Sequence, residues 1–362
     1  MKIAILADPI SNQKAGIHTY TKELFSALLK LDNQNEYYFI HSENNNFFND
    51  KNHFIIEKSK ILIPFRETYR KFVKIPQLLK KLKPDIVIET CHIGPFNTPK
   101  NCKKITIIHD LTPILFPNFH IKKSVIIHKL LLKKIVKDAD LIITPSTTTK
   151  TDIIKKYRIN EEKIKIIHGA PSSETSKNSQ FPKNIKAPYL LYLGTIEPRK
   201  NLQILIESFL ELKRENNIPH SLVLAGEIGW KSKKILSLAK NNKEIIFTGH
   251  INEDKKITLY KNADMFIYPS LYEGFGLPPL EAMSHNIPVI CSTGGSLKEL
   301  FNEYALMFDP QDKKTLKNHI LKLIKNKTLK ENLIKKAFEY SKSFTWQSSA
   351  LQLLSEFKNL IK

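Results

Sequence analysis

The sequence predicts an α/β protein with two doubly wound domains, each built on a parallel sheet. Short apolar runs of strand length alternate with amphipathic helical patterns, which is typical of parallel strands covered by helices. Residues 169–188 interrupt this alternation, because they are rich in Ser, Asn, Lys and Pro and have almost no apolar periodicity. At 362 residues the chain is long enough for two domains of ordinary size. We therefore expect an N-terminal domain over residues 1–172, a linker over 173–188 and a C-terminal domain over 189–345.

In the N-terminal half, continuous runs of aliphatic and aromatic residues indicate buried strands. Apolar residues recurring with helical spacing indicate the helices between them. The expected strands are residues 2–6, 37–41, 85–89, 104–109, 141–145 and 164–168. The expected helices are residues 17–31, 75–82, 122–137 and 148–155.

The same alternation returns after the linker. The expected strands are residues 189–194, 221–226, 245–249, 265–269 and 288–292. The expected helices are residues 202–216, 231–240 and 253–262, followed by one that begins at Pro278-Pro279, where missing N–H groups cost little. Residues 344–362 form a last amphipathic pattern, and one placement for that helix (about 346–362) is back against the N-terminal domain.

The formal charge of +22 points to nucleic acid, an anionic membrane surface or anionic substrates. Nearly all of the basic residues are Lys, whereas base and phosphate recognition favours Arg, and no nucleic-acid motif is present. Residues 71–83 and 122–137 are basic amphipathic stretches that suit an anionic lipid surface. The alternatives are a compositional preference for Lys and ordinary sheet-covering helices with a solvated Lys face.

The three cysteines are scattered without a CxxC pair, which suits a reducing cytoplasm. The first apolar run is too short for a signal peptide, and no run is long enough to span a bilayer. We expect a cytoplasmic protein, with peripheral binding at the inner face of the plasma membrane as an option.

Two glutamates, Glu273 and Glu281, bracket a glycine-containing loop between a strand and a helix. Gly274 and Gly276 let the backbone approach a ligand closely, and a helix N-terminus favours anions. A carboxylate beside such a terminus is better suited to accept hydroxyl groups than to bind phosphate. A ligand that carries both phosphate and vicinal hydroxyls, such as a nucleotide sugar, fits this pattern.

With these residues the chain resembles the retaining glycosyltransferases of family 4 (glycosyltransferase group 1), and in particular bacterial O-antigen and capsule mannosyltransferases. The resemblance implies the GT-B architecture, in which two Rossmann-like domains face each other across a cleft. It rests on the ordered blocks Ala15-Gly16-Ile17-His18-Thr19-Tyr20, Ile108-His109-Asp110-Leu111, Ala139-Asp140-Leu141-Ile142-Ile143-Thr144-Pro145-Ser146, Glu197-Pro198-Arg199-Lys200-Asn201 and Glu273-Gly274-Phe275-Gly276-Leu277-Pro278-Pro279-Leu280-Glu281.

The resemblance implies roles for the C-terminal blocks. Arg199 and Lys200 would hold the donor diphosphate and stabilise the charge that develops on it. Glu281 would accept hydrogen bonds from the ribose, and Glu273 would bind hydroxyls of the donor sugar. Further donor contacts are expected from the loop backbone and from the end of an earlier strand beside the base. They involve Gly274, Phe275, Gly276, Leu277, Gly249 and His250, with core packing as an equal alternative for Phe275.

In the N-terminal domain the resemblance implies that His109 contacts the donor sugar and that Gly16 lets its loop approach the phosphates or the acceptor. Asp110 is a weaker candidate that is equally readable as a loop cap. Ala15 and His18 depart from the family pattern, which often has glycine and arginine at these places, and they leave the acceptor side of this loop open.

No cofactor or metal is expected. Asp138-Ala139-Asp140 looks like a metal-binding Asp-x-Asp motif, but it stands where a helix ends and a strand begins. The histidines show no HExxH spacing, and a dinucleotide-dependent oxidoreductase would need a G-x-G-x-x-G run that this chain lacks.

The expected function is hexosyl transfer with retention, first of all of mannose from GDP-mannose, to a hydroxyl of a growing cell-surface glycan. The resemblance implies a polyprenyl-linked acceptor and a place in lipopolysaccharide biosynthesis. UDP-, ADP- or dTDP-sugar donors are alternatives. A basic nucleic-acid- or membrane-binding protein without catalysis, or a binder of sugar nucleotides that does not catalyse transfer, is the alternative of another class.

Overall fold

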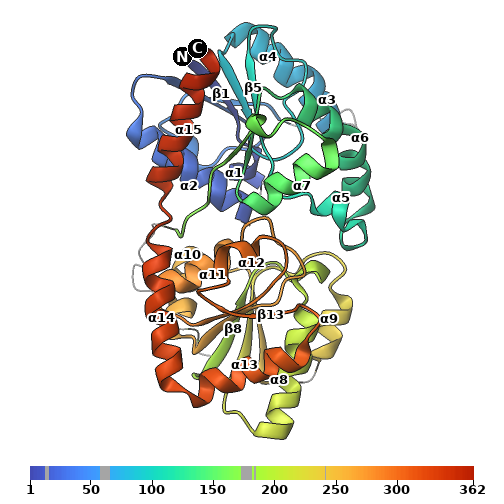
Figure 1. The fold of residues 1–362 in the computed structure, drawn as a ribbon. Helices are drawn as coiled ribbons and strands as arrows, with labels where there is room; N and C mark the ends of the chain where they lie inside the picture. Colours follow the sequence, from blue (N-terminus) through green and yellow to red (C-terminus); the bar gives the residue numbers. More distant parts are fainter. Residues whose placement is uncertain (13–15, 58–65, 173–181, 183–184, 241) are drawn as a thin grey trace. The chain divides into compact units, whose positions relative to one another are not determined.

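The computed structural model describes residues 1–12, 16–57, 66–172, 182, 185–240 and 242–362 (Figure 1). These residues form two compact units. Unit 1 comprises Met1–Leu115, Lys122–Gly169 and Thr345–Lys362, and unit 2 comprises Phe116–Ile121 and Ala170–Phe344. Most of the linker predicted over 173–188 lies outside the described residues. Both ends of the chain belong to unit 1.

Unit 1 contains a seven-stranded sheet in the order β3-β2-β1-β4-β5-β6-β7, and all neighbouring strands are parallel. Because the inner strands are buried on both faces, they read as continuous aliphatic runs. The strands are β1 (Lys2–Leu6), β2 (Glu36–His41), β3 (His53–Ile55), β4 (Ile86–Glu89), β5 (Lys103–Ile107), β6 (Leu141–Thr144) and β7 (Ile164–Ile166).

Helices cover both faces of this sheet (Figure 1). They are α1 (Asp8–Asn12), α2 (Gly16–Leu31), α3 (Arg66–Tyr69), α4 (Ile75–Leu82), α5 (Thr112–Leu115), α6 (Lys122–Asp138), α7 (Thr147–Tyr157) and α15 (Trp346–Ile361). Shorter turns are the 3-10 segments η1 (Asn46–Phe48) and η4 (Glu161–Lys163) and the π-helical segment η2 (Arg70–Lys74).

The C-terminal helix α15 packs against α2, although the rest of the chain between them belongs largely to unit 2. The ring of Trp346 meets that of Tyr20 edge-on at 5.5 Å between centroids. Ser349 Oγ donates to the carbonyl of His168 at 2.7 Å. The apolar stripe of α15, which includes Leu353 and Phe357, is fully buried and completes the core on this side of unit 1.

Unit 2 contains a six-stranded parallel sheet in the order β10-β9-β8-β11-β12-β13. Its strands are β8 (Tyr189–Leu193), β9 (Ser221–Ala225), β10 (Ile245–Gly249), β11 (Met265–Tyr268), β12 (Val289–Ser292) and β13 (Leu306–Phe308). Its helices are α8 (Leu202–Asn216), α9 (Lys233–Leu238), α10 (Glu253–Asn262), α11 (Leu277–Ser284), α12 (Ser296–Phe301), α13 (Lys313–Lys325) and α14 (Lys327–Ser341), with the 3-10 turns η3 (Pro117–Phe119) and η5 (Pro198–Lys200).

Residues Phe116–Ile121 group with unit 2, whereas the chain before and after them belongs to unit 1. Trp230 Nε1 donates to the carbonyl of Phe119 at 2.5 Å, and Lys231 Nζ donates to the carbonyl of Asn118 at 2.6 Å. Trp230 therefore anchors this short segment.

The predicted doubly wound α/β fold is confirmed, with strand order differing from the chain order in the way that this class requires. Short edge strands β3 and β13 and the helices α13 and α14 were not predicted. Strand β5 ends at Ile107, so His109 stands two positions beyond the strand rather than at its end. No helix in the described ranges is both long enough and apolar enough to cross a membrane.

Candidate active site

The predicted site of unit 2 lies where the strand order reverses. Strands β8 and β11 are neighbours, while β9 follows β8 on one side and β12 follows β11 on the other. The loops that leave β8 and β11 therefore diverge, and in doubly wound sheets ligands bind in the crevice that opens there. The first loop carries Arg199 and Lys200, and the second carries Glu273, so residues that are more than 70 positions apart in the sequence meet.

Two cations hold the carboxylate of Glu273 from both sides. Lys200 Nζ lies 2.6 Å from its Oε1, and Arg199 Nη1 lies 3.0 Å from its Oε2. Lys200 also donates to the hydroxyl of Tyr268 at 2.8 Å, a partner that sequence reasoning did not identify. Glu273 and Lys200 are each only 8 % exposed, so these charges act in a poorly solvated place where they interact strongly.

The turn η5 positions the two cations. Glu197 caps it by accepting the N–H of Arg199 at 2.9 Å, and Pro198 supplies a pre-set φ in its first position. Arg199 Nη1 further donates to the carbonyl of Tyr272 at 2.7 Å, which ties η5 to the second loop. The Glu-Pro-Arg-Lys sequence therefore has a local structural meaning: it builds a tight turn that fixes two adjacent basic side chains.

Burial and the neighbouring charges shift the pKa values of Lys200 and Glu273. Burial lowers the pKa of Lys200 more than the nearby Glu273 raises it, and the pKa lies below the ordinary lysine value. Burial alone would raise the pKa of Glu273, but Arg199 and Lys200 outweigh it and hold the pKa below the ordinary carboxyl value. The arrangement offers two fixed cations and one carboxylate, which can bind a diphosphate and sugar hydroxyls respectively.

The glycine loop after β11 is supported by a second glycine pair that the sequence analysis did not single out. A Cβ on Gly294 would lie 2.5 Å from the carbonyl oxygen of Leu271, and one on Gly295 would lie 2.4 Å from that of Glu273. Ser296 Oγ donates to the carbonyl of Phe275 at 2.9 Å. The signal in the sequence was the Gly-Gly-Ser run directly after β12, at the same sheet edge as the other loops.

Helix α11 begins at Leu277, with Gly276 at φ 107° before it and proline in its first turn, as predicted. Glu281 lies on this helix and is buried. Its Oε1 accepts from Lys256 Nζ at 2.8 Å, and its Oε2 accepts from the hydroxyl of Tyr260 at 3.1 Å. A carboxylate has further lone pairs, so the two contacts orient Glu281 and leave acceptor capacity for hydroxyl groups.

The other residues predicted to contact the donor differ in burial. Phe275 is buried and meets the ring of Phe344 at a steep angle with centroids 6.2 Å apart, which favours the core-packing alternative for its side chain. Gly249 has a positive φ of 66°, and a Cβ at this position would meet no atom within 4 Å. His250 is half exposed, with Nδ1 3.7 Å from Glu227. Leu277 is buried in the first turn of α11.

In unit 1, His109 stands in the loop after β5 and is 8 % exposed. Its Nε2 lies 3.0 Å from the carbonyl of Thr90; because a carbonyl only accepts, Nε2 carries the proton. The ring of Tyr20 meets it edge-on at 5.0 Å. Burial lowers the pKa of His109 below the ordinary histidine value, so the ring is neutral at physiological pH.

A chain of histidines that the sequence analysis missed supports His109. The backbone N–H of His109 donates to His92 Nε2 at 3.0 Å, and His92 Nδ1 lies 3.3 Å from His128 Nε2. His128 Nδ1 lies 2.8 Å from the carbonyl of Ser124, so it carries the proton, and His92 Nδ1 then donates to His128 Nε2. Burial lowers the pKa of His92 to about 3, so the chain is neutral. We call it the histidine chain.

The other predicted N-terminal residues are placed as follows. Asp110 accepts from the N–H and the hydroxyl of Thr112 at 2.8 and 2.6 Å, the pattern of the loop cap that was its alternative reading. Gly16 is the first residue of α2, and His18 Nδ1 lies 3.0 Å from the carbonyl of Pro9. Ala15 lies outside the described residues.

The Asp-x-Asp run has a structural use. Asp140 accepts the N–H of Lys104 at 2.7 Å, between β5 and the start of β6. In the described ranges, no group of three or more His, Cys, Asp and Glu side chains could hold a metal ion. Independence from metals and cofactors stays a prediction.

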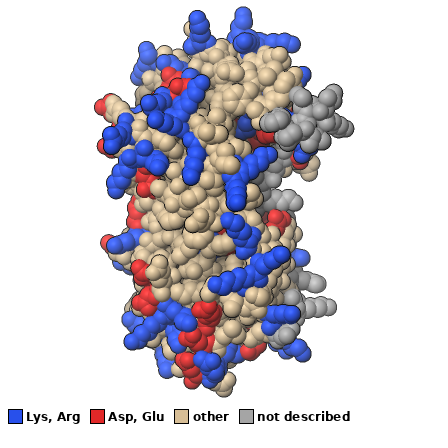
Figure 2. Space-filling view, turned by 90° about the vertical axis from the view of Figure 1, so that its right-hand side faces the viewer, with Lys and Arg blue, Asp and Glu red and all other residues tan. Residues whose placement is uncertain are grey.

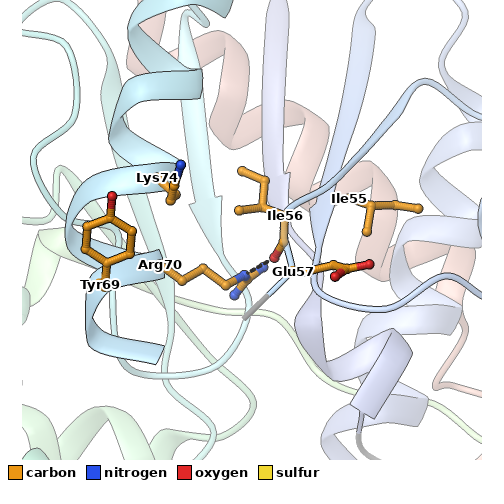
Figure 3. A pocket seen from close by; sticks show the side chains of 6 residues that line it. All are labelled: Ile55, Ile56, Glu57, Tyr69, Arg70 and Lys74. Carbon is orange, nitrogen blue, oxygen red and sulfur yellow. Dashed lines mark hydrogen bonds between the residues drawn. The ribbon is translucent and has the colours of Figure 1, made fainter. Parts of the chain in front are cut away.

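A cavity of about 580 Å³ lies beside η2 in unit 1 (Figure 3). It is lined by Ile55, Ile56, Glu57, Tyr69, Arg70 and Lys74. Arg70 is almost fully buried and forks onto Asp8 at 2.6 and 2.8 Å, while its Nε donates to the carbonyl of Ile56 at 2.5 Å. The guanidinium thus joins α1 and the residue after β3 to η2, and none of the predicted site residues lines this cavity.

Two family models match the chain in succession. "Glycosyltransferase Family 4" matches residues 15–170, and "Glycosyl transferases group 1" matches residues 173–340. Between them they leave out only the two ends and residues 171–172. The charged site at the point where the strand order reverses, in a chain of two such units, thus defines a glycosyltransferase of the GT-B architecture.

Comparisons with individual proteins agree with this family. The Escherichia coli O-antigen chain mannosyltransferase B is 28% identical, and the match covers 99% of this chain and 100% of that protein. The Salmonella typhimurium O-antigen chain mannosyltransferase RfbU is 31% identical over 59% of this chain and 58% of its own length. Sucrose-phosphate synthase from Thermosynechococcus elongatus has the same fold, with a TM-score of 0.76 at 19% identity over 99% of each chain. The chain belongs to the family 4 (group 1) glycosyltransferases.

Proposed function

We propose that the protein transfers a hexosyl group from a nucleotide sugar to a hydroxyl of a growing, lipid-linked cell-surface glycan, with retention of the anomeric configuration. Mannose from GDP-mannose is the first candidate. The observation that carries the proposal is the ion cluster in which Arg199 and Lys200 meet Glu273 beside the glycine loop. The similarity to an O-antigen chain mannosyltransferase along the whole chain supports mannose.

In the proposed reaction the bond between the anomeric carbon and the diphosphate oxygen breaks, and its electron pair stays with the diphosphate. Arg199 and Lys200 stabilise this charge, because they are held in place before the reaction and need little reorganisation. The acceptor hydroxyl oxygen forms the new bond on the same face of the sugar, and its proton passes to the departing phosphate. No metal is needed in this scheme.

The carboxylates have separate roles in the proposal. Glu281, oriented by Lys256 and Tyr260, accepts hydrogen bonds from the ribose hydroxyls. Glu273 binds hydroxyls of the donor sugar, and His109 contacts that sugar, as the family resemblance implies. Each of these roles needs a hydrogen-bonding group in a fixed orientation, and each of the three side chains has at least one hydrogen-bond partner in its own unit.

The nucleotide is tested by a thermal-shift panel of GDP, UDP, ADP and dTDP, each with its sugar conjugates. A ligand that binds the native state raises the midpoint of unfolding, so the matching base should stand out. We expect GDP and GDP-mannose to give the largest shifts. A larger shift with UDP would retain the transferase proposal and replace the donor; the HepE protein of Anabaena, solved with UDP and glucose, has the same fold.

Transfer itself is tested with purified protein, the donor from the panel and a lipid-linked glycan acceptor, with the anomeric configuration of the product read by NMR. Retained configuration is the expected result. Inverted configuration would contradict the proposed mechanism. Salt-sensitive retention on DNA, together with a lack of any nucleotide shift, would favour the non-catalytic alternative that the charge of +22 suggests.

A further inference from the structure

Helix α6 of unit 1 has one buried and one exposed side. Its buried side chains, Val125, Leu132, Ile135 and Val136, face the core of unit 1. Apart from Asp138 at the C-terminal end of the helix, the exposed positions fall on one arc of roughly 140° at 100° per residue. We call this arc the α6 face; it consists of Lys122, Lys123, Ile126, Lys129, Leu130, Lys133, Lys134 and Lys137.

Two large aliphatic side chains lie in the middle of the α6 face. Ile126 is 56% exposed and Leu130 is 72% exposed. They are four residues apart and are therefore neighbours on the helix surface. The lysines flank them on both sides of the arc. A helix that only covered a sheet would bury such side chains or replace them with polar ones, so an explanation based on solvated lysines does not account for this pair.

The lysines of the α6 face form no ion pair with any carboxylate that the structure describes. Lysines elsewhere in the molecule do: Lys313 and Lys317 of α13 both pair with Glu211, at 2.6 and 2.8 Å. Figure 2 views the molecule from the side on which α6 lies in Figure 1, and Lys and Arg side chains predominate over Asp and Glu in the part that belongs to unit 1. The α6 face is thus basic, uncompensated and apolar along its middle.

We propose that the α6 face binds an anionic lipid bilayer, with Ile126 and Leu130 entering the headgroup region and the lysines contacting lipid phosphates. Lysine stems can lie along the apolar boundary while their ammonium groups stay in the polar layer. This combination of a basic face with protruding aliphatic residues is what an interfacial helix requires. The inference rests on the proposed function in one respect: a lipid-linked acceptor would be met at such a surface.

The observations favour a bilayer over nucleic acid. A nucleic acid would use the lysines but would gain nothing from exposed Ile126 and Leu130, and the α6 face has no arginine or aromatic residue for base contacts. The other basic stretch, 71–83, is a weaker candidate. Its Lys71 is turned toward Glu89, at 3.5 Å, and donates to the carbonyl of Ile93 at 2.9 Å.

The experiment measures co-sedimentation of the full chain with vesicles of phosphatidylcholine, with and without phosphatidylglycerol. One variant combines Lys129→Gln, Lys133→Gln and Lys134→Gln, and its control combines Lys322→Gln, Lys325→Gln and Lys335→Gln at exposed positions of α13 and α14. A second variant combines Ile126→Gln and Leu130→Gln. Its control combines Leu351→Gln and Ile361→Gln, which are 56% and 44% exposed on α15.

We expect binding only to vesicles that contain phosphatidylglycerol. The α6 lysine variant should bind about 100-fold more weakly, since each lysine near an anionic surface contributes roughly tenfold or less. The α6 aliphatic variant should bind about tenfold more weakly at unchanged charge. Neither control should change binding more than about twofold.

Equal losses in the α6 variants and their controls would overturn the proposal, because charge in general and not this face would then drive binding. A loss in the lysine variant alone, matched by an equal loss of binding to duplex DNA, would assign the face to polyanions. Transfer to an acceptor without a lipid tail separates the two proposals. All variants should retain it; absence of transfer in the unmodified protein, with the vesicle results intact, would reject the proposed function and leave the bilayer surface standing.

Discussion

At the scale of single residues, the proposed function makes the carboxylate of Glu273 and the diphosphate of a donor competitors for the same two cations. Lys200 and Arg199 already contact Glu273 at 2.6 and 3.0 Å, so their positive charge is positioned before any ligand arrives. A bound diphosphate would take over part of this interaction and release Glu273 to accept sugar hydroxyls. In the proposed reaction the cluster would therefore couple binding of the phosphates to the release of Glu273 for the donor sugar.

Replacing Lys200 tests the role of the cations. Lys200→Ala should lower kcat by roughly 100- to 1,000-fold, the usual effect of removing one group that stabilises transition-state charge. The control is Lys330→Ala, which removes a lysine that pairs with Asp264 at 2.5 Å. Steady-state kinetics and urea unfolding of both variants check the prediction. Equal falls in kcat would mean that the loss reflects general destabilisation.

The two glutamates should respond in opposite directions when their charge is removed. Glu281→Gln should weaken binding of the nucleoside diphosphate about tenfold, because an amide accepts ribose hydroxyls less strongly than a carboxylate. Glu273→Gln should leave that binding unchanged or tighter, because the competing anion is gone, while turnover falls. Titration calorimetry with the diphosphate, beside kcat for each variant, separates the roles; weaker diphosphate binding in Glu273→Gln alone would reverse the assignment.

At the scale of elements, the histidine chain links the loops after β4 and β5 to helix α6. His92 is the central member: it accepts from the backbone of His109 and faces His128 on α6. His92 has a positive φ of 59°, so the loop adopts an uncommon conformation to make these contacts. The orientation of the His109 loop thus depends on a group two elements away.

This chain has a consequence for the pH dependence of stability. Burial holds the pKa of His92 at about 3, below the ordinary value of 6.5, so the unfolded chain binds the proton more readily. The stability contributed by neutral His92 is fully present above the unfolded pKa of 6.5 and is lost as pH falls toward 3. Between pH 7 and pH 5 this loss amounts to about 2 kcal/mol.

The variant His92→Gln keeps a hydrogen-bond acceptor but does not titrate. It should be less stable than the unmodified protein at pH 7, and the difference in unfolding free energy should shrink by about 2 kcal/mol at pH 5. His250→Gln, at a half-exposed histidine, is the control for replacing an imidazole that is not buried. Urea unfolding at the two pH values provides the measurement. A constant difference for His92→Gln would show that His92 is not held neutral by its surroundings.

The elements also show which parts of the structure sequence reasoning can reach. Inner strands such as β8 and β11 were predictable because burial on both faces demands a continuous apolar run. The edge strands β3, β7 and β13 have only three residues each, too few to show a period, and of these three only β7 was predicted. That Arg199 and Lys200 lie near Glu273 could be predicted, because the loops that carry them follow β8 and β11, which end at the same edge of the sheet.

The partners that orient the candidate site could not be predicted in the same way. Lys256 contacts Glu281 from another helix, and nothing in its own surroundings distinguishes it from the many lysines of this chain. His92 and His128 lie 36 residues apart and meet only because α6 packs beside the loop after β4. Such contacts depend on how helices pack on the sheet, and helical periodicity gives the buried side of a helix but not its neighbours.

At the scale of the whole molecule, the two units differ in how the chain builds them. Unit 2 is formed by one long segment and the short segment Phe116–Ile121, whereas unit 1 requires the C-terminal helix α15. The two tryptophans divide between them, because Trp346 lies in unit 1 and Trp230 in unit 2. Each tryptophan is therefore a fluorescent reporter of one unit, and the Trp230→Phe and Trp346→Phe backgrounds allow each unit to be followed alone.

A core substitution in α15 should therefore act on unit 1. Leu353 is fully buried, and Leu353→Ala should destabilise unit 1 by about 3 kcal/mol through the lost apolar contacts and the cavity left behind. The control is Leu351→Ala, two positions away on the same helix and 56% exposed, which should change stability by less than about 0.5 kcal/mol. Urea unfolding followed by the fluorescence of Trp346 measures the stability of both variants. Binding of the nucleoside diphosphate should persist in both variants, because the proposed nucleotide site lies in unit 2.

Loss of nucleotide binding in Leu353→Ala under conditions where Trp230 still reports a folded unit 2 would show that the nucleotide site depends on residues of unit 1.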